Sequence, residues 1–134
     1  MVTYLLDTSI ASHVIRGDRP LVMKRLMSVP PDSIVVSVIT EAELRYGVVK
    51  RGEPKGLKSR VEAFLLMVDV LPWTRDIVEA YASLRVARES AGAPLAPMDM
   101  LIAAHAKVTG ATLVSSDSAF SFFPAGLHLE DWSK

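Results

Sequence analysis

The sequence predicts an α/β domain built around a mostly parallel sheet, and three observations lead to that fold class. Short apolar segments alternate with longer segments of helical periodicity, which is the order expected of successive strand–helix–strand units. The segment 33–37, SIVVS, is a continuous buried type of strand and does not alternate, as strands covered on both faces require. With 134 residues, 50% of them hydrophobic, the chain can bury one core, so residues 1–134 are expected to form a single domain.

The N-terminal part predicts a strand followed by two helices. Residues 2–6 are β-branched or apolar, and they stop at the cluster Asp-Thr-Ser at 7–9, which is suited to capping a helix. Apolar residues then recur on one helical face until Gly17, where the helix is expected to end. Pro20 is suited to begin a second helix, which ends before the proline pair at 30–31.

The central part predicts a strand, two helices and a further strand. The strand at 33–37 is followed by a helix from about Thr40 to Lys50. Residues 51–56 form a loop containing glycine and proline, and the spacing of apolar residues predicts a helix over 57–67. Residues 68–71 are a third short strand, which Pro72 ends.

The C-terminal part completes the alternating order. Residues 75–91 carry apolar side chains at helical spacing and predict a long amphipathic helix. Pro97 begins another helix, which Gly110 ends, and the segments 112–115 and 127–129 supply the last strands. Parallel strands joined in this way connect through right-handed crossovers, and ligands gather beyond the carboxyl ends of the strands.

Composition excludes several classes of protein. Lys plus Arg and Asp plus Glu number 15 each, so net charge by itself gives no argument for nucleic acid or a membrane. The absence of cysteine excludes a disulfide scaffold, a thiolate metal site and a cysteine nucleophile. The N-terminus lacks the basic region of a secretory signal, and no apolar stretch reaches membrane-spanning length. We therefore expect a cytoplasmic protein without a membrane partner.

Four acidic residues fall where a strand has just ended or a helix is starting: Asp7, Glu43, Asp99 and Asp117. Each also has a purely structural explanation. Asp7 could cap a helix, and Glu43 lies at capping-box spacing from Thr40. Asp99 suits the first turn of a helix, and Asp117 suits an ordinary turn. Because the carboxyl ends of parallel strands meet at one crevice, we nevertheless expect the four carboxylates to converge.

Converging carboxylates imply a cation. Carboxylates within about 4 to 6 Å of one another repel and raise one another's pKa, so their cluster is costly unless a cation lies among them. All-oxygen ligands, no Cys and only three His favour Mg2+ or Mn2+. Setting those four aside from the 15 acidic residues leaves 11 against 15 basic ones, so the remaining surface favours a polyanion. This combination is suited to phosphodiester hydrolysis by a metal-activated water.

Competing motifs are absent or fit less well. The chain has no Walker A sequence, no G-x-G-x-x-G after the first strand and no H-E-x-x-H, which argues against NTPase, dinucleotide-binding and zinc-protease functions. Asp7 could instead accept a phosphoryl group, as in receiver or haloacid-dehalogenase-like domains. The latter fold would require an aspartate where Ser9 stands, and neither fold accounts for Glu43. His105 lies among apolar residues and is interpreted as a packed helix residue, not a ligand.

Five segments together carry a family resemblance. They are LLDTS (5–9), TEAELRYG (40–47), PMDMLIAAHA (97–106), TLVSSD (112–117) and LEDW (129–132). In order and spacing they make the chain resemble the PIN-domain toxins of the VapC type over essentially its whole length. The resemblance implies a three-layer α/β/α PIN-like fold with a mostly parallel central sheet. It also implies a divalent-metal-dependent endoribonuclease and a cognate VapB-type antitoxin encoded alongside.

The resemblance also assigns residues and partners. Asp7, Glu43 and Asp99 match the three acids of the family's catalytic metal site, and Asp117 matches its fourth acid. Such toxins form homodimers, cut RNA that in several relatives is tRNA, and are covered at the site by the C-terminal segment of the antitoxin. Mg2+ or Mn2+ is the implied cofactor.

Candidate contacts to RNA lie close to these acids. They are Ser9, Arg45, Lys50 and Arg51. Ser9 could equally cap the first helix, and Arg45 could pair with a neighbouring acid. Two alternatives stay open: a non-catalytic PIN-fold module that binds RNA or protein, and a nuclease that acts on DNA. The complete set of four acids argues against the first, since a site without a metal has no use for clustered charge.

Overall fold

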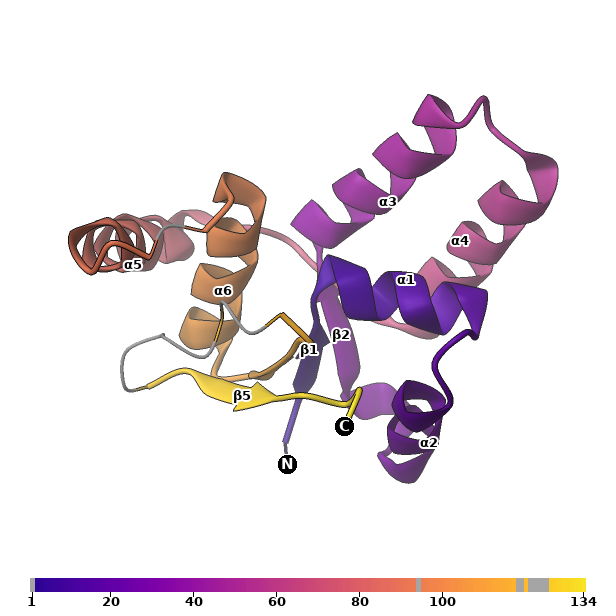
Figure 1. The fold of residues 1–134 in the computed structure, drawn as a ribbon, viewed down its shortest axis with the longest axis horizontal. Helices are drawn as coiled ribbons and strands as arrows, with labels where there is room; N and C mark the ends of the chain where they lie inside the picture. Colours follow the sequence, from indigo (N-terminus) through magenta and orange to yellow (C-terminus); the bar gives the residue numbers. More distant parts are fainter. Residues whose placement is uncertain (1, 94, 118–119, 121–125) are drawn as a thin grey trace.

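A single parallel sheet organises the part of the chain that the structure describes, residues 2–93, 95–117, 120 and 126–134 of the computed structural model (Figure 1). Its strands are β1 (Tyr4–Leu6), β2 (Ile34–Ser37), β3 (Asp69–Leu71), β4 (Thr112–Val114) and β5 (His128–Glu130). Their order is β3-β2-β1-β4-β5, and every pairing is parallel. The register places Leu5 of β1 between Val35 of β2 and Leu113 of β4. The predicted mostly parallel sheet is therefore confirmed.

The helices follow the predicted order, with shifted boundaries. They are α1 (Thr8–Arg16), α2 (Pro20–Ser28), α3 (Val38–Lys50), α4 (Lys55–Met67), α5 (Val78–Ser90) and α6 (Pro97–Thr109), with short 3-10 turns η1 (Pro31–Ser33) and η2 (Arg75–Ile77). The long helix predicted over 75–91 thus begins as a 3-10 turn. Gly17 and Gly110 end α1 and α6 in the left-handed conformation, with φ of 65° and 73°, as expected of helix-ending glycines.

The start of α3 corrects one prediction. The helix begins at Val38, because Ser37 at the end of β2 is its N-cap and the Ser37 hydroxyl accepts a hydrogen bond from the Ile39 N–H at 3.1 Å. Thr40 lies inside the first turn, so the interpretation of Thr40 and Glu43 as a capping box is wrong. Glu43 is thereby placed in the second turn of α3, where its side chain is available for other contacts.

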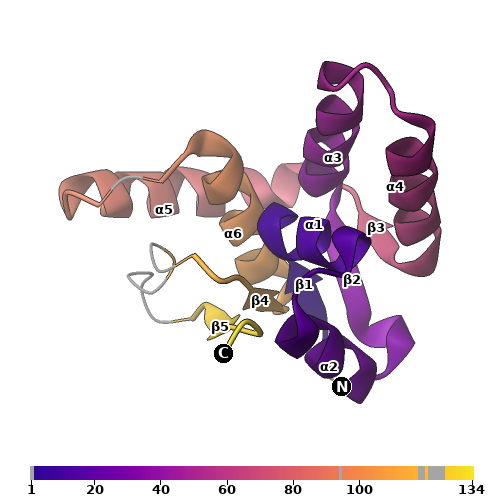
Figure 2. The ribbon, with the colours of Figure 1, turned by 45° about the vertical axis from the view of Figure 1, so that its right-hand side comes forward.

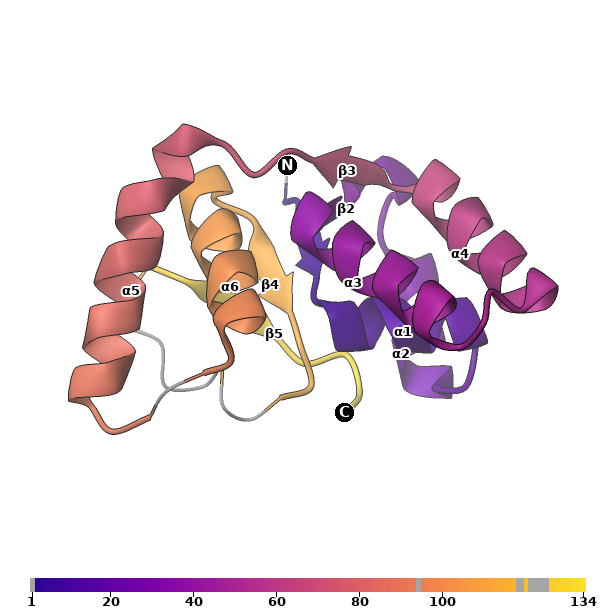
Figure 3. The same ribbon diagram turned by 90° about the horizontal axis from the view of Figure 1, so that it is seen from above.

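Alternate strand residues face two different cores, which gives the three layers. Leu6, Val36 and Val114 pack in the core that includes buried residues of α1, α2, α3 and α4. Leu5 and Leu113 face the other way and pack against α6. In Figure 2, α1 lies between the sheet and the α3–α4 hairpin. Figure 3 shows this hairpin and the α5–α6 pair at opposite ends of the molecule. The predicted three-layer α/β/α arrangement is confirmed.

A buried tryptophan fastens the C-terminal strand to the N-terminal part of the chain. Trp132 is 1% exposed, and its ring lies 5.3 Å from that of Tyr4 between centroids. The Arg25 guanidinium of α2 lies over the same ring at 5.5 Å and binds the Glu130 carboxylate of β5 at 2.5 Å. These contacts fix the edge strand β5 beside α2. Among the described residues, no helix combines the length and apolarity needed to cross a membrane.

The strand order determines where a ligand site can form. The chain moves from β1 to β2 on one side and later returns to β4 on the other side of β1. A crevice opens beyond the carboxyl ends of strands where the order switches in this way, here between β1 and β4. The segments that follow β1 and β4 therefore face one another across this crevice, and they begin with Asp7 and Ser115.

The two-sided burial of the central strands predicts a large loss of stability when they are truncated. Leu113→Ala should lower the free energy of unfolding by about 2 to 5 kcal/mol, because its side chain is 0% exposed and its removal leaves a cavity. Urea unfolding followed by circular dichroism measures the change. Leu66→Ala is the matched control, since Leu66 is 88% exposed and its truncation should leave the midpoint nearly unchanged. Equal losses in both variants would contradict this packing.

Candidate active site

Asp7 occupies the first position beyond β1 and joins the sheet to α1. Its N–H donates to the Val114 carbonyl at 3.0 Å, which extends the pairing with β4 by one residue. Its Oδ1 accepts from the Ile10 N–H at 2.8 Å and so caps α1. The side chain is nearly inaccessible, at 3% exposure. Asp7 is thus both the helix cap and a carboxylate held at the crevice, and Ser9 is not the cap.

The surroundings of Asp7 disfavour its charge. Burial, and to a smaller extent the negative charges of Asp99 and Asp117, raise the pKa of the Asp7 carboxyl to about 6. Hydrogen bonds from the Ser115 hydroxyl and the Ile10 N–H act in the opposite direction but do not cancel the effect of burial. The Asp7 carboxylate is therefore a charged group held where nearby positive charge would stabilise it.

Asp99 joins the acidic group from the first turn of α6. Burial raises the pKa of the half-buried Asp99 carboxyl, and the charges of Glu43 and Asp117 raise it as well. Since α6 leads into β4, its N-terminus lies at the same edge of the sheet as the end of β1. The structure thus brings Asp99 near all three of the other predicted site acids, in agreement with the argument from strand ends.

Glu43 reaches the group through a contact that the sequence did not reveal. The Thr8 hydroxyl donates to Glu43 Oε1 at 2.5 Å. It also lies 3.1 Å from the buried Thr40 hydroxyl, and since Thr8 has one hydroxyl hydrogen, Thr40 is the donor in that pair. The chain of bonds Thr40 to Thr8 to Glu43 connects α1 with α3 and orients the Glu43 carboxylate. The only sequence signal for Thr8 is its position next to Asp7.

Asp117 lies in the turn that follows β4. Its N–H donates to the Ser115 hydroxyl at 3.0 Å, and its carbonyl accepts from the Phe120 N–H at 3.1 Å, so the turn function proposed for Asp117 is present. The side chain is exposed, yet its charge acts on Asp7 and Asp99. Because Ser115 bonds to both Asp7 and Asp117, its hydroxyl links the acids that follow β1 and β4.

The donor set of these acids fits a hard divalent cation in its chemistry. All donors are carboxylate or hydroxyl oxygens, which Mg2+ and Mn2+ prefer. The carboxylates lie close enough to raise the pKa of Asp7 and Asp99. Within the described residues, however, no three His, Cys, Asp or Glu side chains are arranged to hold a metal ion. The acids described here converge without forming a closed cage.

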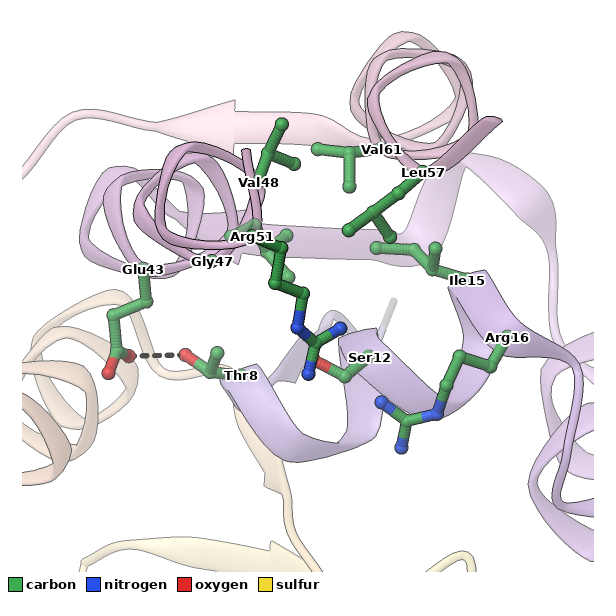
Figure 4. A pocket seen from close by; sticks show the side chains of 11 residues that line it. Thr8, Ser12, Ile15, Arg16, Glu43, Gly47, Val48, Arg51, Leu57 and Val61 are labelled. Atoms are coloured by element: carbon green, nitrogen blue, oxygen red, sulfur yellow. Dashed lines mark hydrogen bonds between the residues drawn. The ribbon is translucent and has the colours of Figure 1, made fainter. Parts of the chain in front are cut away.

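The predicted RNA contacts lie in different surroundings. Ser9 is exposed in the first turn of α1. The Arg45 guanidinium binds Glu41 at 2.7 Å, the pairing that the sequence left open. The Lys50 ammonium lies over the Tyr46 ring at 5.7 Å. Of these four residues, only Arg51 lines the pocket that contains Glu43 (Figure 4).

This pocket, here called the α1–α3 groove, runs between α1, α3 and α4. Its lining residues are Thr8, Ser12, Ile15, Arg16, Glu43, Leu44, Gly47, Val48, Arg51, Leu57 and Val61. In Figure 4, the Glu43–Thr8 hydrogen bond lies at one end and aliphatic side chains of α3 and α4 lie along one wall. The groove is therefore continuous with the acidic group through Glu43 and Thr8.

His105 has a structural position, as predicted. It is 1% exposed in α6, and its Nδ1 lies 2.8 Å from the Ser37 hydroxyl. Burial lowers the pKa of the imidazole, which keeps the ring neutral. Since Ser37 caps α3, this hydrogen bond joins the helix that carries Asp99 to the start of the helix that carries Glu43.

The raised pKa of Asp7 predicts that Asp7→Asn stabilises the metal-free protein at neutral pH. The folded pKa of about 6 lies above the unfolded value of 3.8, so the ionised carboxyl destabilises the fold increasingly as pH rises through that window. Asparagine can still cap α1. The gain near pH 8 has an upper value of about 3 kcal/mol. Chemical unfolding in EDTA should show it shrinking toward pH 4, and an equal effect at both pH values would contradict the prediction.

Comparison with known proteins agrees with this arrangement. Residues 4–124 match the family model described as PIN domain. The chain is 28% identical to the tRNA(fMet)-specific endonuclease VapC of Shigella flexneri, over 99% of this chain and 100% of that protein. It is 32% identical to Ribonuclease VapC2 of Rickettsia felis, over 98% of each. The crystal structure of VapBC2 from Rickettsia felis, bound to a DNA fragment from their promoter, contains a chain that superposes with a TM-score of 0.89 and 31% identity, covering 98% of this chain and 99% of that one. The chain therefore belongs to the PIN domain family, and its full-length relatives named here are VapC proteins.

Proposed function

We propose that the protein is a divalent-metal-dependent endoribonuclease and the toxin of a type II toxin–antitoxin pair. One observation carries the proposal: a chain of the PIN domain family brings Asp7, Glu43, Asp99 and Asp117 to one edge of its sheet. The names of the Shigella flexneri and Rickettsia felis relatives, an endonuclease specific for tRNA(fMet) and a ribonuclease, support RNA as the substrate class. Transfer RNA is therefore the first substrate to test.

The acids supply the ligands for Mg2+ or Mn2+ in this proposal. Asp7, Glu43 and Asp99 would hold the ion directly or through water, and Asp117 would complete or tune the ligand set. When bound, the ion supplies positive charge that offsets the charge developing on the phosphate, and it acidifies the attacking water. Burying the Asp7 carboxylate among further negative charges destabilises its ionised form. A bound cation would offset that cost, which gives the arrangement a function.

The other residues of the site orient the carboxylates. The Ser115 hydroxyl donates to Asp7, and Thr8 donates to Glu43 Oε1. Each hydroxyl thus gives one carboxylate a hydrogen-bond donor that favours one orientation. Cleavage requires no protein nucleophile, since water attacks the phosphorus atom and the bond from phosphorus to the 3′ oxygen breaks. The 3′ oxygen leaves with a proton that the water gives up. The products would carry a 5′-phosphate and a 3′-hydroxyl.

A VapB-type antitoxin is the proposed protein partner. The Rickettsia felis structure is a VapBC2 complex bound to promoter DNA, and its matching chain covers nearly all of this one. We propose that the equivalent partner of this chain is encoded alongside it and covers the acids. A basic side chain would be suited to that position, because it supplies positive charge to the carboxylates and blocks the site to RNA.

We further propose that the toxin forms a homodimer and acts in the cytoplasm on cellular RNA. Helix α5 contacts α6 and η2 along one side, while Val78 and Val86 of α5 are 47% and 62% exposed. Exposed aliphatic side chains of this kind are suited to an interface between copies. Sedimentation of the purified toxin at several concentrations tests the dimer, and a monomer at all of them would contradict it.

The central experiment incubates the antitoxin-free protein with total bacterial tRNA in Mg2+ or Mn2+. We expect discrete new 5′ ends that disappear in EDTA and in Asp99→Asn, because Asp99 interacts electrostatically with each of the other three acids. Mn2+ should also raise the melting temperature of the wild type more than that of Asp99→Asn. A melting shift without cleavage would indicate the wrong RNA, whereas neither effect would favour the non-catalytic module.

The Thr8 contact predicts a separate, graded effect. Thr8→Val keeps the shape of the side chain but removes the donor to Glu43, and it should reduce cleavage and Mn2+ affinity by about tenfold. Thr8→Ser retains the hydroxyl and should recover most of both quantities. Titration calorimetry with Mn2+ and initial cleavage rates measure them, with melting temperature as a check on folding. Equal losses in the two variants would contradict this role of the hydrogen bond, because Thr8→Ser keeps the hydroxyl donor.

A further inference from the structure

The α1–α3 groove leads from the acidic group to two arginines. Thr8 and Glu43 lie at its inner end. Arg16, two turns beyond Thr8 on α1, and Arg51, two turns beyond Glu43 at the end of α3, both line it. Two turns of helix correspond to about 12 Å between backbone positions, so the two arginines begin farther along the groove than Thr8 and Glu43, which lie nearer the phosphate being cut. The arginines are placed for phosphates that flank it.

The groove favours a polyanion more than its neighbouring surface does. Arg51 is exposed and forms no ion pair within the described part of the chain. Arg16 binds Asp18 at 2.8 Å, but both side chains are over 40% exposed, so the pair is weak and can be exchanged. The opposite side of the α3–α4 hairpin is lined by Arg45 and Lys58 together with Glu53 and Glu62. Apart from Glu43, the described residues that line the α1–α3 groove include no acid.

A glycine in the wall of the groove also points to a ligand. Gly47 lies one turn beyond Glu43 and one turn before Arg51 on α3. A Cβ added there would meet no atom within 4 Å, so packing does not require glycine. Glycine is unfavourable inside a helix. Where no neighbouring atom requires it, the missing side chain leaves the helix backbone accessible to a ligand that approaches closely. The groove is therefore lined by two arginines and by a stretch of α3 that no side chain covers at Gly47.

We propose that the α1–α3 groove binds the RNA strand next to the scissile phosphate, with Arg16 and Arg51 contacting flanking phosphates. This inference rests on the proposed ribonuclease function and names the path of its substrate. Continuity with Glu43 gives the strand a route to the acids, and the two guanidiniums match its charge. The half-buried aliphatic side chains of Ile15 and Leu57 offer a surface for a ribose or base between them.

The test measures RNA binding without cleavage. A fluorescein-labelled single-stranded RNA of mixed sequence is titrated with the antitoxin-free protein in EDTA, at several salt concentrations, by fluorescence anisotropy. Arg16→Ala and Arg51→Ala should each weaken binding by about five- to tenfold at low salt and reduce the salt slope by about 0.7. Arg75→Ala is the matched control, because Arg75 is an exposed arginine outside the groove. It should bind as the wild type does.

A second pair of variants tests the wall. Gly47→Leu fills the groove and should weaken RNA binding by a similar factor, while its melting temperature stays at or above that of the wild type. Ala42→Leu places the same side chain on an exposed position of α3 outside the groove and should bind RNA normally. Loss of binding in Ala42→Leu as well would show that the effect is not local.

The outcomes separate this inference from the proposed function. If the wild type cleaves RNA but Arg16→Ala and Arg51→Ala behave as Arg75→Ala does, the groove inference is wrong and the ribonuclease stands. It is also wrong if the wild type does not bind the RNA, or if these variants weaken only a complex with the antitoxin. If the arginine variants lose RNA binding but the wild type cuts nothing in Mg2+ or Mn2+, the groove inference stands and the proposed function fails.

Discussion

Burial of the Asp7 carboxylate at the end of the central strand is the constraint on which the rest of the structure depends. Its backbone continues the sheet to Val114, its Oδ1 begins α1, and its other contact is with the Ser115 hydroxyl beyond β4. The Ile10 N–H and the Ser115 hydroxyl donate to the carboxylate, but its burial and the charges of Asp99 and Asp117 still raise its pKa to about 6. The same residue therefore sets the geometry of the fold and the charge requirement of the crevice.

The positions of three acids followed from the order of strands and helices alone. In a parallel sheet all carboxyl ends lie at one edge, so residues that follow β1 and β4, and those that begin α6, must meet there. Asp7, Asp117 and Asp99 satisfy this condition in the sequence. Glu43 lies in the second turn of α3, so its arrival depends on where the helix begins. The spacing from Thr40 suggested a start two residues too late, because Ser37 is a strand residue and a helix cap at once.

The contacts between helices could not be predicted, because they depend on how the helices are rotated against one another. Nothing in the order of residues showed that Thr8 of α1 would face Glu43 of α3. The basic segment near the end of α3 has the same limitation. Arg45 and Arg51 look equivalent in the sequence, but helical phase turns Arg45 toward Glu41 and Arg51 toward α1. The number of basic residues was evident from the sequence. The side of the helix on which each one lies could be seen only in the packed α3–α4 hairpin.

Acid acts on the buried His105 imidazole and on the crevice carboxyls in opposite directions. Protonation removes the cost of burying a charged Asp7 carboxyl, so its contribution to stability rises as pH falls through about 6 toward 4. The raised pKa of Asp99 acts in the same direction. The imidazole of His105 has a lowered pKa, so its contribution falls as pH drops below 6.5. The two effects partly cancel in the same range. A free energy of unfolding that changes little between pH 6.5 and 4 would therefore conceal two opposite effects. Repulsion among the crevice carboxyls decreases, while the hydrogen-bonded contact between α6 and the start of α3 weakens.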